Sequence, residues 1–331
     1  MNMNQSKSNP APLSYQPDAW IYNDSILEWI FEPALGNQLP PLYQIFRAYS
    51  YWYFKLTAQA YLKGGKELFQ SLANLLSKNP NQSSYKLVLP DYEIFVDLLD
   101  ARFFQVVNEL TNPQSDLKIL SHLLSLGDTF IDIGANHGSF AIVASKLVGK
   151  NGRVIAVEPQ PRLANIVEKS LSINALGDFK VYPVALGNIE GDVEFLIPQG
   201  TSGSAGLFAE HSATDRFNAI KVPIKRFDDL VEWQKFKGKT LIKLDIEGSE
   251  SAFLLGASKM ISALKPTLII EIHPGTLKAA KTTGEDLKRL LVDLGYDKFA
   301  EIDNPKVTFS LEGLNTQVQR NVVIYASAFG H

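Results

Sequence analysis

Two acids and two glycines have the order of a nucleotide-cofactor site. Asp132 lies near the end of a short apolar run, Thr129–Ile133, and is followed by Gly134 and Gly138, behind which apolar residues recur at helical spacing. Glycines let the main chain turn sharply and approach a ligand, and the first amides of a helix attract an anion. Glu158 ends the next apolar run, where it can accept hydrogen bonds from ribose hydroxyls. Together these residues predict a cradle for an adenosine-containing cofactor.

The glycine turn is not that of a dinucleotide-binding protein. Such proteins hold a pyrophosphate with a G-x-G-x-x-G turn, whereas here Ala135, Asn136 and His137 fill the space between the two glycines. S-adenosylmethionine lacks a pyrophosphate, and its carboxylate can lie at the helix terminus while its ribose meets Glu158. An NAD-dependent oxidoreductase is less favoured, because no Tyr-x-x-x-Lys follows the cofactor motifs. A turn that binds nothing is the plain alternative.

A lysine inside a later apolar run marks a second chemical cluster. Lys243 interrupts this run, and Asp245, Glu247 and Glu250 follow it directly. Burying a lysine in a central strand costs several kcal/mol unless it is paired. We therefore expect a carboxylate partner, which would be Glu271 or one of the three acids.

A histidine at the end of the next strand is the expected general base. The run Thr267–Ile272 carries Glu271 and is followed by His273. Adjacent parallel strands would place Asp245, Glu271 and His273 at the same sheet edge as Gly134. A neutral imidazole can take the proton of an acceptor hydroxyl, while Glu271 would orient the lysine or the acceptor. A histidine that caps the strand end is the alternative.

The same cluster permits a metal-assisted mechanism. Carboxylates and an imidazole are ligands for an octahedral Mg²⁺, which would lower the pKa of the acceptor. A metal is not the expected cofactor, since the lysine or a cationic sulfonium can neutralise the same acids. If a metal is present, its candidate ligands are Asp245, Glu247, Glu250, Glu271 and His273.

Composition limits the class of protein and its partners. The chain has 331 residues, a formal charge of −3 and no cysteine, so it can bury a large core without disulfides or cysteine metal clusters. This charge provides no basic field for a nucleic acid. No apolar run has the length of a membrane span, and the polar opening lacks a signal-peptide core. A cytoplasmic location is expected.

The chain divides into an N-terminal helical extension, residues 1–84, and a catalytic domain, residues 85–331. The extension holds more aromatic residues than one amphipathic stripe requires. Core packing is the expected role, with a substrate lid or a homodimer face as alternatives. The aromatic residues are Tyr43, Phe46, Tyr49, Tyr51, Trp52, Tyr53, Phe54 and Tyr61.

The elements that must position the two clusters alternate between strand and helix. A polar loop, Gln199–Gly206, separates two of the expected strands and is expected to close over a ligand. The further elements expected are strands at Tyr85–Leu89, Tyr92–Leu98, Phe179–Ala185, Val193–Ile197 and Ala219–Ile224, and a helix at Asp116–Leu126.

Four motifs together resemble the FkbM family of S-adenosylmethionine-dependent methyltransferases, over roughly Leu87 to Tyr325. They are Asp132-Ile133-Gly134-Ala135-Asn136, Val154-Ile155-Ala156-Val157-Glu158-Pro159, Lys243-Leu244-Asp245-Ile246-Glu247-Gly248-Ser249-Glu250 and Glu271-Ile272-His273. The resemblance implies an α/β fold, the Rossmann-like class I methyltransferase sheet of seven strands with helices on both faces, closed by an antiparallel strand at Asn321–Tyr325. The cofactor residues that it implies are Asp132, Gly134, Ala135, Asn136, Gly138, Glu158, Ala185 and Asp245, with Asp245 near the transferred methyl group.

The same resemblance implies O-methylation of a hydroxyl on a natural product or glycan. Methyl transfer is an in-line displacement at a sulfonium, so the site must align acceptor oxygen, methyl carbon and sulfur. N- or C-methylation on the same fold and a non-catalytic cofactor-binding module are the alternatives. The walls of the acceptor pocket are expected from the N-terminal region and the mobile loops.

Overall fold

The computed structural model describes residues 30, 32–57, 68–69, 71–72, 75, 84–112, 116–198, 202–208 and 217–327, without the side chains of residues 53–55. Tyr61 and the side chains of Tyr53 and Phe54, from the predicted aromatic group, lie outside the described residues, as do residues 199–201 of the predicted loop. None of the helices in the described ranges combines the length and apolar character needed to cross a membrane.

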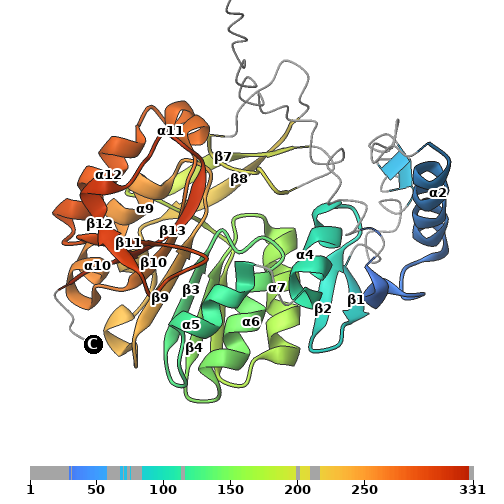
Figure 1. Cartoon of the computed structure of the whole chain (residues 1–331), viewed down its shortest axis with the longest axis horizontal. Helices are drawn as coiled ribbons and strands as arrows, with labels where there is room; N and C mark the ends of the chain where they lie inside the picture. Colours follow the sequence, from blue (N-terminus) through green and yellow to red (C-terminus); the bar gives the residue numbers. More distant parts are fainter. Residues whose placement is uncertain are drawn as a thin grey trace, which may run out of the picture.

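One large mixed sheet forms the centre of the molecule (Figure 1). Its order is β12-β11-β13-β10-β9-β3-β4-β5, in which β5, β4, β3, β9 and β10 are parallel and β13 is antiparallel to both of its neighbours. The strands are β3 (Thr129–Ile133), β4 (Arg153–Val157), β5 (Asp178–Tyr182), β9 (Thr240–Leu244), β10 (Thr267–Ile272), β11 (Lys298–Glu301), β12 (Thr308–Ser310) and β13 (Arg320–Tyr325).

Seven of these strands confirm the predicted class I sheet, with β13 as the predicted closing antiparallel strand. The eighth, β12, pairs with β11 at the edge of the sheet and was not predicted. It has only three residues, all of them exposed, so it lacks the alternation of buried and exposed positions that indicates a strand.

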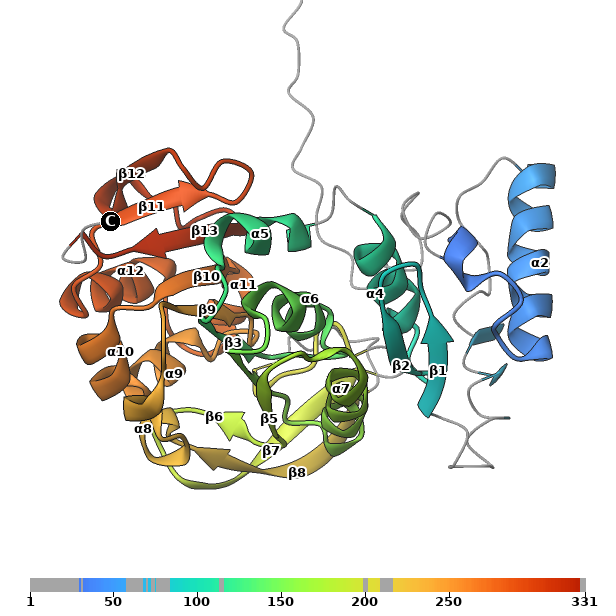
Figure 2. The same cartoon turned by 90° about the horizontal axis from the view of Figure 1, so that it is seen from below.

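Helices cover both faces of this sheet (Figure 2). In β3, Phe130 packs into one apolar core while Ile131 and Ile133 pack into the other, which explains why every residue of this strand is buried. The first face carries α4 (Arg102–Thr111), α5 (Leu120–Leu123), α6 (Ser139–Val148) and α7 (Pro161–Asn174). The second carries α8 (Phe227–Leu230), α9 (Glu250–Gly256), α10 (Ser258–Leu264), α11 (Pro274–Ala279) and α12 (Gly284–Asp293).

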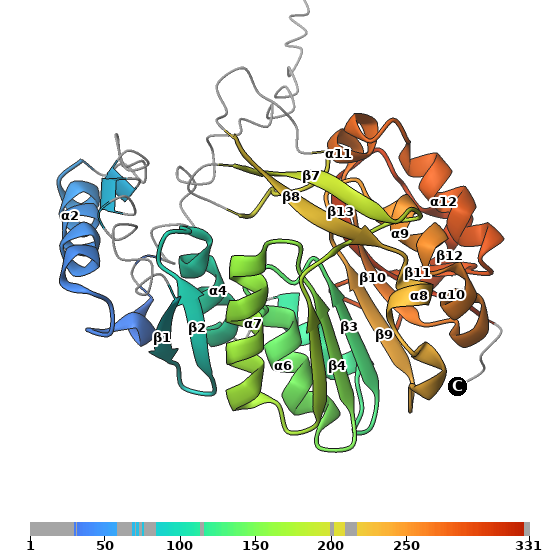
Figure 3. The ribbon, with the colours of Figure 1, turned by 180° about the vertical axis from the view of Figure 1, so that it is seen from behind.

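Two smaller sheets account for the other predicted strands. β1 (Ser84–Val88) and β2 (Glu93–Asp97) form an antiparallel hairpin. β7 (Gly191–Pro198) and β8 (Phe217–Lys225) form the predicted pair, seen side by side in Figure 3, with β6 (Ala185–Leu186) beside β8.

Two predicted elements differ in the structure. The strand predicted at Phe179–Ala185 is divided into β5 and β6, with Pro183 in the break. The helix predicted at Asp116–Leu126 is a 3₁₀ turn, η4 (Asp116–Ile119), followed by the single turn of α5.

The N-terminal segment packs on the catalytic half through aromatic side chains. It contains η2 (Pro33–Leu35) and α2 (Pro41–Thr57). Tyr43 and Phe46 of α2 are buried against Phe103 and Phe104 of α4, whereas Trp52 is 61% exposed. Core packing is therefore the role of the buried part. The lid, the dimer face and the division of the chain at residue 84 stay predictions.

Candidate active site

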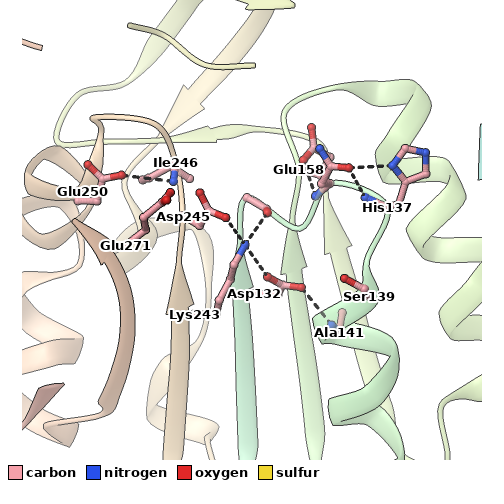
Figure 4. Close-up of polar contacts among 12 residues, drawn as sticks. Asp132, His137, Ser139, Ala141, Glu158, Lys243, Asp245, Ile246, Glu250 and Glu271 are labelled. Atoms are coloured by element: carbon pink, nitrogen blue, oxygen red, sulfur yellow. Dashed lines mark hydrogen bonds and ion pairs between the residues drawn. The ribbon is translucent and has the colours of Figure 1, made fainter. Parts of the chain in front are cut away.

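The two clusters predicted from the sequence meet at one edge of the sheet (Figure 4). β3, β9 and β10 are adjacent and parallel, and their register pairs Asp132 with Lys243. Their carboxyl ends therefore bring Gly134, Asp245 and Glu271 together, as predicted.

Lys243 lies between two carboxylates and a main-chain carbonyl. Its Nζ is 3.2 Å from Asp245 Oδ2 and 3.7 Å from Asp132 Oδ1, and it donates a hydrogen bond to the Gly134 carbonyl at 3.0 Å. Burial favours the neutral amine, but Asp245 and Asp132 outweigh it and raise the pKa of Lys243. The predicted carboxylate partner is thus Asp245, and the lysine is a fixed cation.

The glycine turn is locked by contacts on both sides. Gly134 has φ +77°, and a Cβ there would lie 2.0 Å from the Asp245 carbonyl oxygen. Asp132 is buried, and its Oδ2 accepts a hydrogen bond from the Ala141 amide in the first turn of α6 at 3.1 Å. Burial raises the pKa of Asp132, against the effects of Lys243 and this amide. Asp132 therefore holds the turn and α6 in place.

A pocket opens above this turn, and we call it the first pocket. Of the predicted cofactor residues, it is lined by Gly134, Ala135, Asn136, Ala185 and Asp245, but not by Asp132, Gly138 or Glu158. It also includes residues that were not predicted to bind the cofactor: Arg102, Val106, Ser139, Phe140, Pro159, Leu186, Phe195, Ser202, Gly203, Ala205, Leu207, Lys243, Ile246, Glu247 and Ser249.

Glu158 is held by the backbone around it. Its Oε2 accepts from the Asn136 amide at 2.8 Å and its Oε1 from the Gln160 amide at 3.0 Å. Burial raises the pKa of this carboxyl to about 7, against the effect of these hydrogen bonds. Its contact with a ribose stays a prediction. Burial lowers the pKa of His137, also in the turn, to about 4, so this histidine is neutral.

The polar loop contacts the glycine turn. Ser202 is only 2% exposed, and its amide donates to Asp100 Oδ1 at 3.1 Å. The Asn136 side-chain amide donates to the Ser202 hydroxyl at 2.9 Å and to its carbonyl at 3.1 Å. The described part of the predicted loop therefore forms a wall of the first pocket, through Ser202, Gly203 and Ala205.

Three acids crowd the edge next to Lys243. One carboxylate oxygen from each of Asp245, Glu247 and Glu271 lies within 4.8 Å of the others. Burial, followed by the charge of Asp245, raises the pKa of Glu247 to about 9 and that of Glu271 to about 8. Burial also works against ionisation of Asp245, but Lys243 outweighs it and lowers the pKa. At neutral pH the carboxyl groups of Glu247 and Glu271 are thus mainly protonated, and Asp245 is the ionised carboxylate of the cluster.

Glu250 serves the backbone. It is buried, and its Oε1 accepts from the amides of Gly248 at 3.2 Å and Ile246 at 3.4 Å. Burial raises its pKa to about 7, with these amides acting in the opposite direction. The structure thus groups three of the five candidate metal ligands, and the metal-assisted mechanism stays an untested alternative.

His273 occupies the N-cap of α11. Its Nδ1 accepts a hydrogen bond from the Thr276 amide at 3.3 Å. Among the described residues, it lines neither the first pocket nor the second pocket described below. The ring thus caps a helix, whereas the sequence left open a histidine that caps the strand end, and the role of His273 as general base stays a prediction.

The turn, the acids and the sheet order can now be compared with known proteins. The family model "Methyltransferase FkbM domain" matches residues 132–298, about half of the chain. This chain belongs to the FkbM methyltransferase family. A solved FkbM methyltransferase from Methylobacillus flagellatus KT is 19% identical, with a TM-score of 0.40, and the match covers 68% of this chain and 54% of that one. The chain thus spans about half the length of that protein.

Two other solved structures are also similar to this FkbM family member. A SAM-dependent methyltransferase from Aquifex aeolicus is 14% identical, with a TM-score of 0.34, over 66% of this chain and 90% of that one. TYW2 from M. jannaschii, solved in complex with AdoMet, is 12% identical, with a TM-score of 0.40, over 73% of this chain and 84% of that one. Comparison with curated proteins finds no match.

Proposed function

We propose that this protein transfers a methyl group from S-adenosylmethionine to a hydroxyl oxygen of a natural product or glycan. The observation that carries the proposal is the position of Asp245 and Lys243. Both line the first pocket, and both also line a second pocket beside it, so that two ligands would meet at this shared wall. A methyl group can pass between two bound molecules only if their sites adjoin, as these two pockets do.

The residues of the first pocket fit S-adenosylmethionine. The N-cap residue of α6, Gly138, makes no side-chain cap. Asp132 accepts from the Ala141 amide, but the first two residues of the helix, Ser139 and Phe140, line the pocket, where their amides are available to a carboxylate. Asp245 provides an ionised carboxylate for a sulfonium. The apolar side chain of Phe195 lies with Ala185 and Leu186 on the remaining wall, where an adenine would pack.

The chain's own residues would supply orientation and a proton acceptor. S-adenosylmethionine supplies an electrophilic methyl group when it is bound. Lys243 fixes the ionised carboxylate of Asp245, which can accept a hydrogen bond from the acceptor hydroxyl and align its oxygen. Glu271 lines the second pocket, and its pKa of about 8 makes its ionised form a stronger base than an ordinary carboxylate, able to take the hydroxyl proton at pH values around and above 8. O-methylation needs such a base, because an alcohol is a weak nucleophile until its proton leaves.

Calorimetric titration with S-adenosylhomocysteine, with NAD⁺ as the control ligand, tests the cofactor. We expect binding of S-adenosylhomocysteine alone. Binding of NAD⁺ alone, or of neither compound, would overturn the proposal.

Two variants separate the candidate bases. We expect Glu271→Gln to abolish transfer of a labelled methyl group while retaining affinity for S-adenosylhomocysteine. His273→Gln is the matched comparison and should keep most of the activity, because His273 caps α11. The opposite result would assign the base to His273, as the sequence predicts, and retention of activity by both variants would exclude each of them.

A further inference from the structure

The second pocket lies between the polar side of α4 and the ends of the central strands. It has a volume of about 340 Å³. Arg102, Phe140, Lys243 and Asp245 line both pockets, so the second begins where the first ends. Glu271 lies on its wall and is absent from the wall of the first pocket. A ligand in the second pocket would therefore reach the acids that we propose to act on a hydroxyl.

Helix α4 presents a row of polar side chains to this pocket. Its apolar residues, among them Phe103 and Val107, are buried in the core. Gln105 and Asn108, three residues apart, line the pocket instead, together with the C-cap residue Asn112. The helix thus divides its surface between the core and the pocket.

Three side-chain amides on these walls have no protein partner. The amides of Gln105, Asn108 and Asn321 are half-buried, and none of them makes a hydrogen bond to another side chain or backbone group in the described part of the chain. An amide offers two donors and an acceptor, and a hydroxyl group is itself both donor and acceptor. Half-buried polar groups without protein partners are available to a ligand.

The charged groups of the pocket favour a neutral ligand. Its two basic side chains are both paired, Arg102 with Glu109 at 2.9 Å and Lys243 with Asp245 at 3.2 Å. Asp116 adds a further acid to the wall. A phosphate or carboxylate group would thus meet acids and already paired cations.

We propose that the second pocket binds the methyl acceptor, and that this acceptor is a neutral, hydroxyl-rich compound of the sugar class. The proposal rests on the proposed function for the position of the reaction, and it selects the glycan side of the natural product or glycan alternative. It also differs from the sequence-based expectation, because α4 and the sheet, rather than the N-terminal region, build these walls.

Saturation-transfer NMR on the complex with S-adenosylhomocysteine tests the class of ligand. The probes are methyl glucoside, glucose 6-phosphate and cyclohexanol, which differ in charge and in the number of hydroxyl groups. We expect methyl glucoside to bind at millimolar concentration and the other two to bind more weakly. Preferential binding of glucose 6-phosphate or cyclohexanol, or no binding of the glucoside, would overturn the proposal.

Two substitutions test the location. The double variant Gln105→Leu/Asn108→Leu should weaken glucoside binding about tenfold or more, because it removes the partners of the ligand hydroxyls. Gln234→Leu, at an exposed position in the short 3₁₀ helix η5 (Trp233–Lys235), is the matched control and should change nothing. Unchanged glucoside binding in the double variant would refute the assignment of this pocket.

Affinity for S-adenosylhomocysteine is measured for every variant. Retained cofactor affinity with lost glucoside binding supports the proposal and shows that the fold is intact. If the wild type binds S-adenosylhomocysteine but not the glucoside, only the proposed acceptor site is refuted. If the wild type does not bind S-adenosylhomocysteine, the proposed function is refuted.

Discussion

Replacement of Lys243 by methionine tests whether the buried cation holds the site together. Methionine keeps the length and apolar stem of the side chain but removes the charge. Asp132, which is 1% exposed, would then have no cation beside it, and the Gly134 carbonyl would lose its donor. Removing one partner of a buried ion pair costs about 3–5 kcal/mol. Domains are stable by only about 5–15 kcal/mol, so this cost is a large share of the total. At about 1.4 kcal/mol per factor of ten, Lys243→Met should raise the ratio of unfolded to folded protein by roughly two to four powers of ten.

The loss of stability in Lys243→Met should increase with pH. Without Lys243, the pKa of the buried Asp132 carboxyl would rise further above its unfolded value of about 3.9. An acid whose pKa is raised in the folded state destabilises the protein increasingly as the pH rises above the unfolded value. The loss of stability in Lys243→Met should thus be larger at pH 8 than at pH 5.

Urea unfolding at the two pH values measures both effects. Lys235→Met is the control, because Lys235 forms an exposed pair with Glu232 and should cost less than about 1 kcal/mol. The double variant Asp132→Asn/Lys243→Met should recover much of the stability, since the deeply buried charge of Asp132 is removed together with its partner and Asp245 keeps contact with water. Equal, pH-independent losses for Lys243→Met and Lys235→Met would refute the reasoning.

Three further predictions concern the turn and the acids. Gly134→Ala should destabilise the fold by about 1–3 kcal/mol and abolish binding of S-adenosylhomocysteine, because its Cβ would collide with the Asp245 carbonyl. Thermal melts and calorimetric titrations measure the two effects, and Gly313→Ala, with open space around it, is the control that should show neither. The rate of methyl transfer should rise between pH 7 and pH 9 as Glu271 ionises, and this rise should be absent in Glu271→Gln. Dialysis against EDTA should leave cofactor affinity unchanged, because a lysine already lies beside Asp245. A loss of affinity that Mg²⁺ restores would instead support a metal at the acidic cluster.

The sequence predicts what is encoded by strand ends and turn residues. The runs around Asp132 and Lys243 identify two central strands, and parallel pairing then brings Gly134, Asp245 and Glu271 to one edge. The closing strand β13 followed from the family resemblance. These features are local in the chain or fixed by sheet topology, so one sequence contains enough information to find them.

The sequence does not show which way a side chain points. Asp132 and Glu158 have the positions expected for cofactor residues, but their oxygens hold backbone amides beside the pocket. His273 follows a strand in the expected place, but its ring caps a helix. Arg102 was missed because it lies in a helix remote from every motif, and only the packing of α4 brings it to the pocket. A polar row at helical spacing was the available signal.

The division of α4 into two sides has a consequence for how new specificities arise. Phe103 and Val107 are buried in the core, whereas Gln105 and Asn108 line the second pocket, so we expect substitutions on the polar side to change the folding free energy less than substitutions on the apolar side. With the acceptor in the second pocket, as proposed, selection in nature or in the laboratory could vary the acceptor preference through a few positions of one helix. The proposed cofactor site, built on the ends of other elements, would be inherited unchanged.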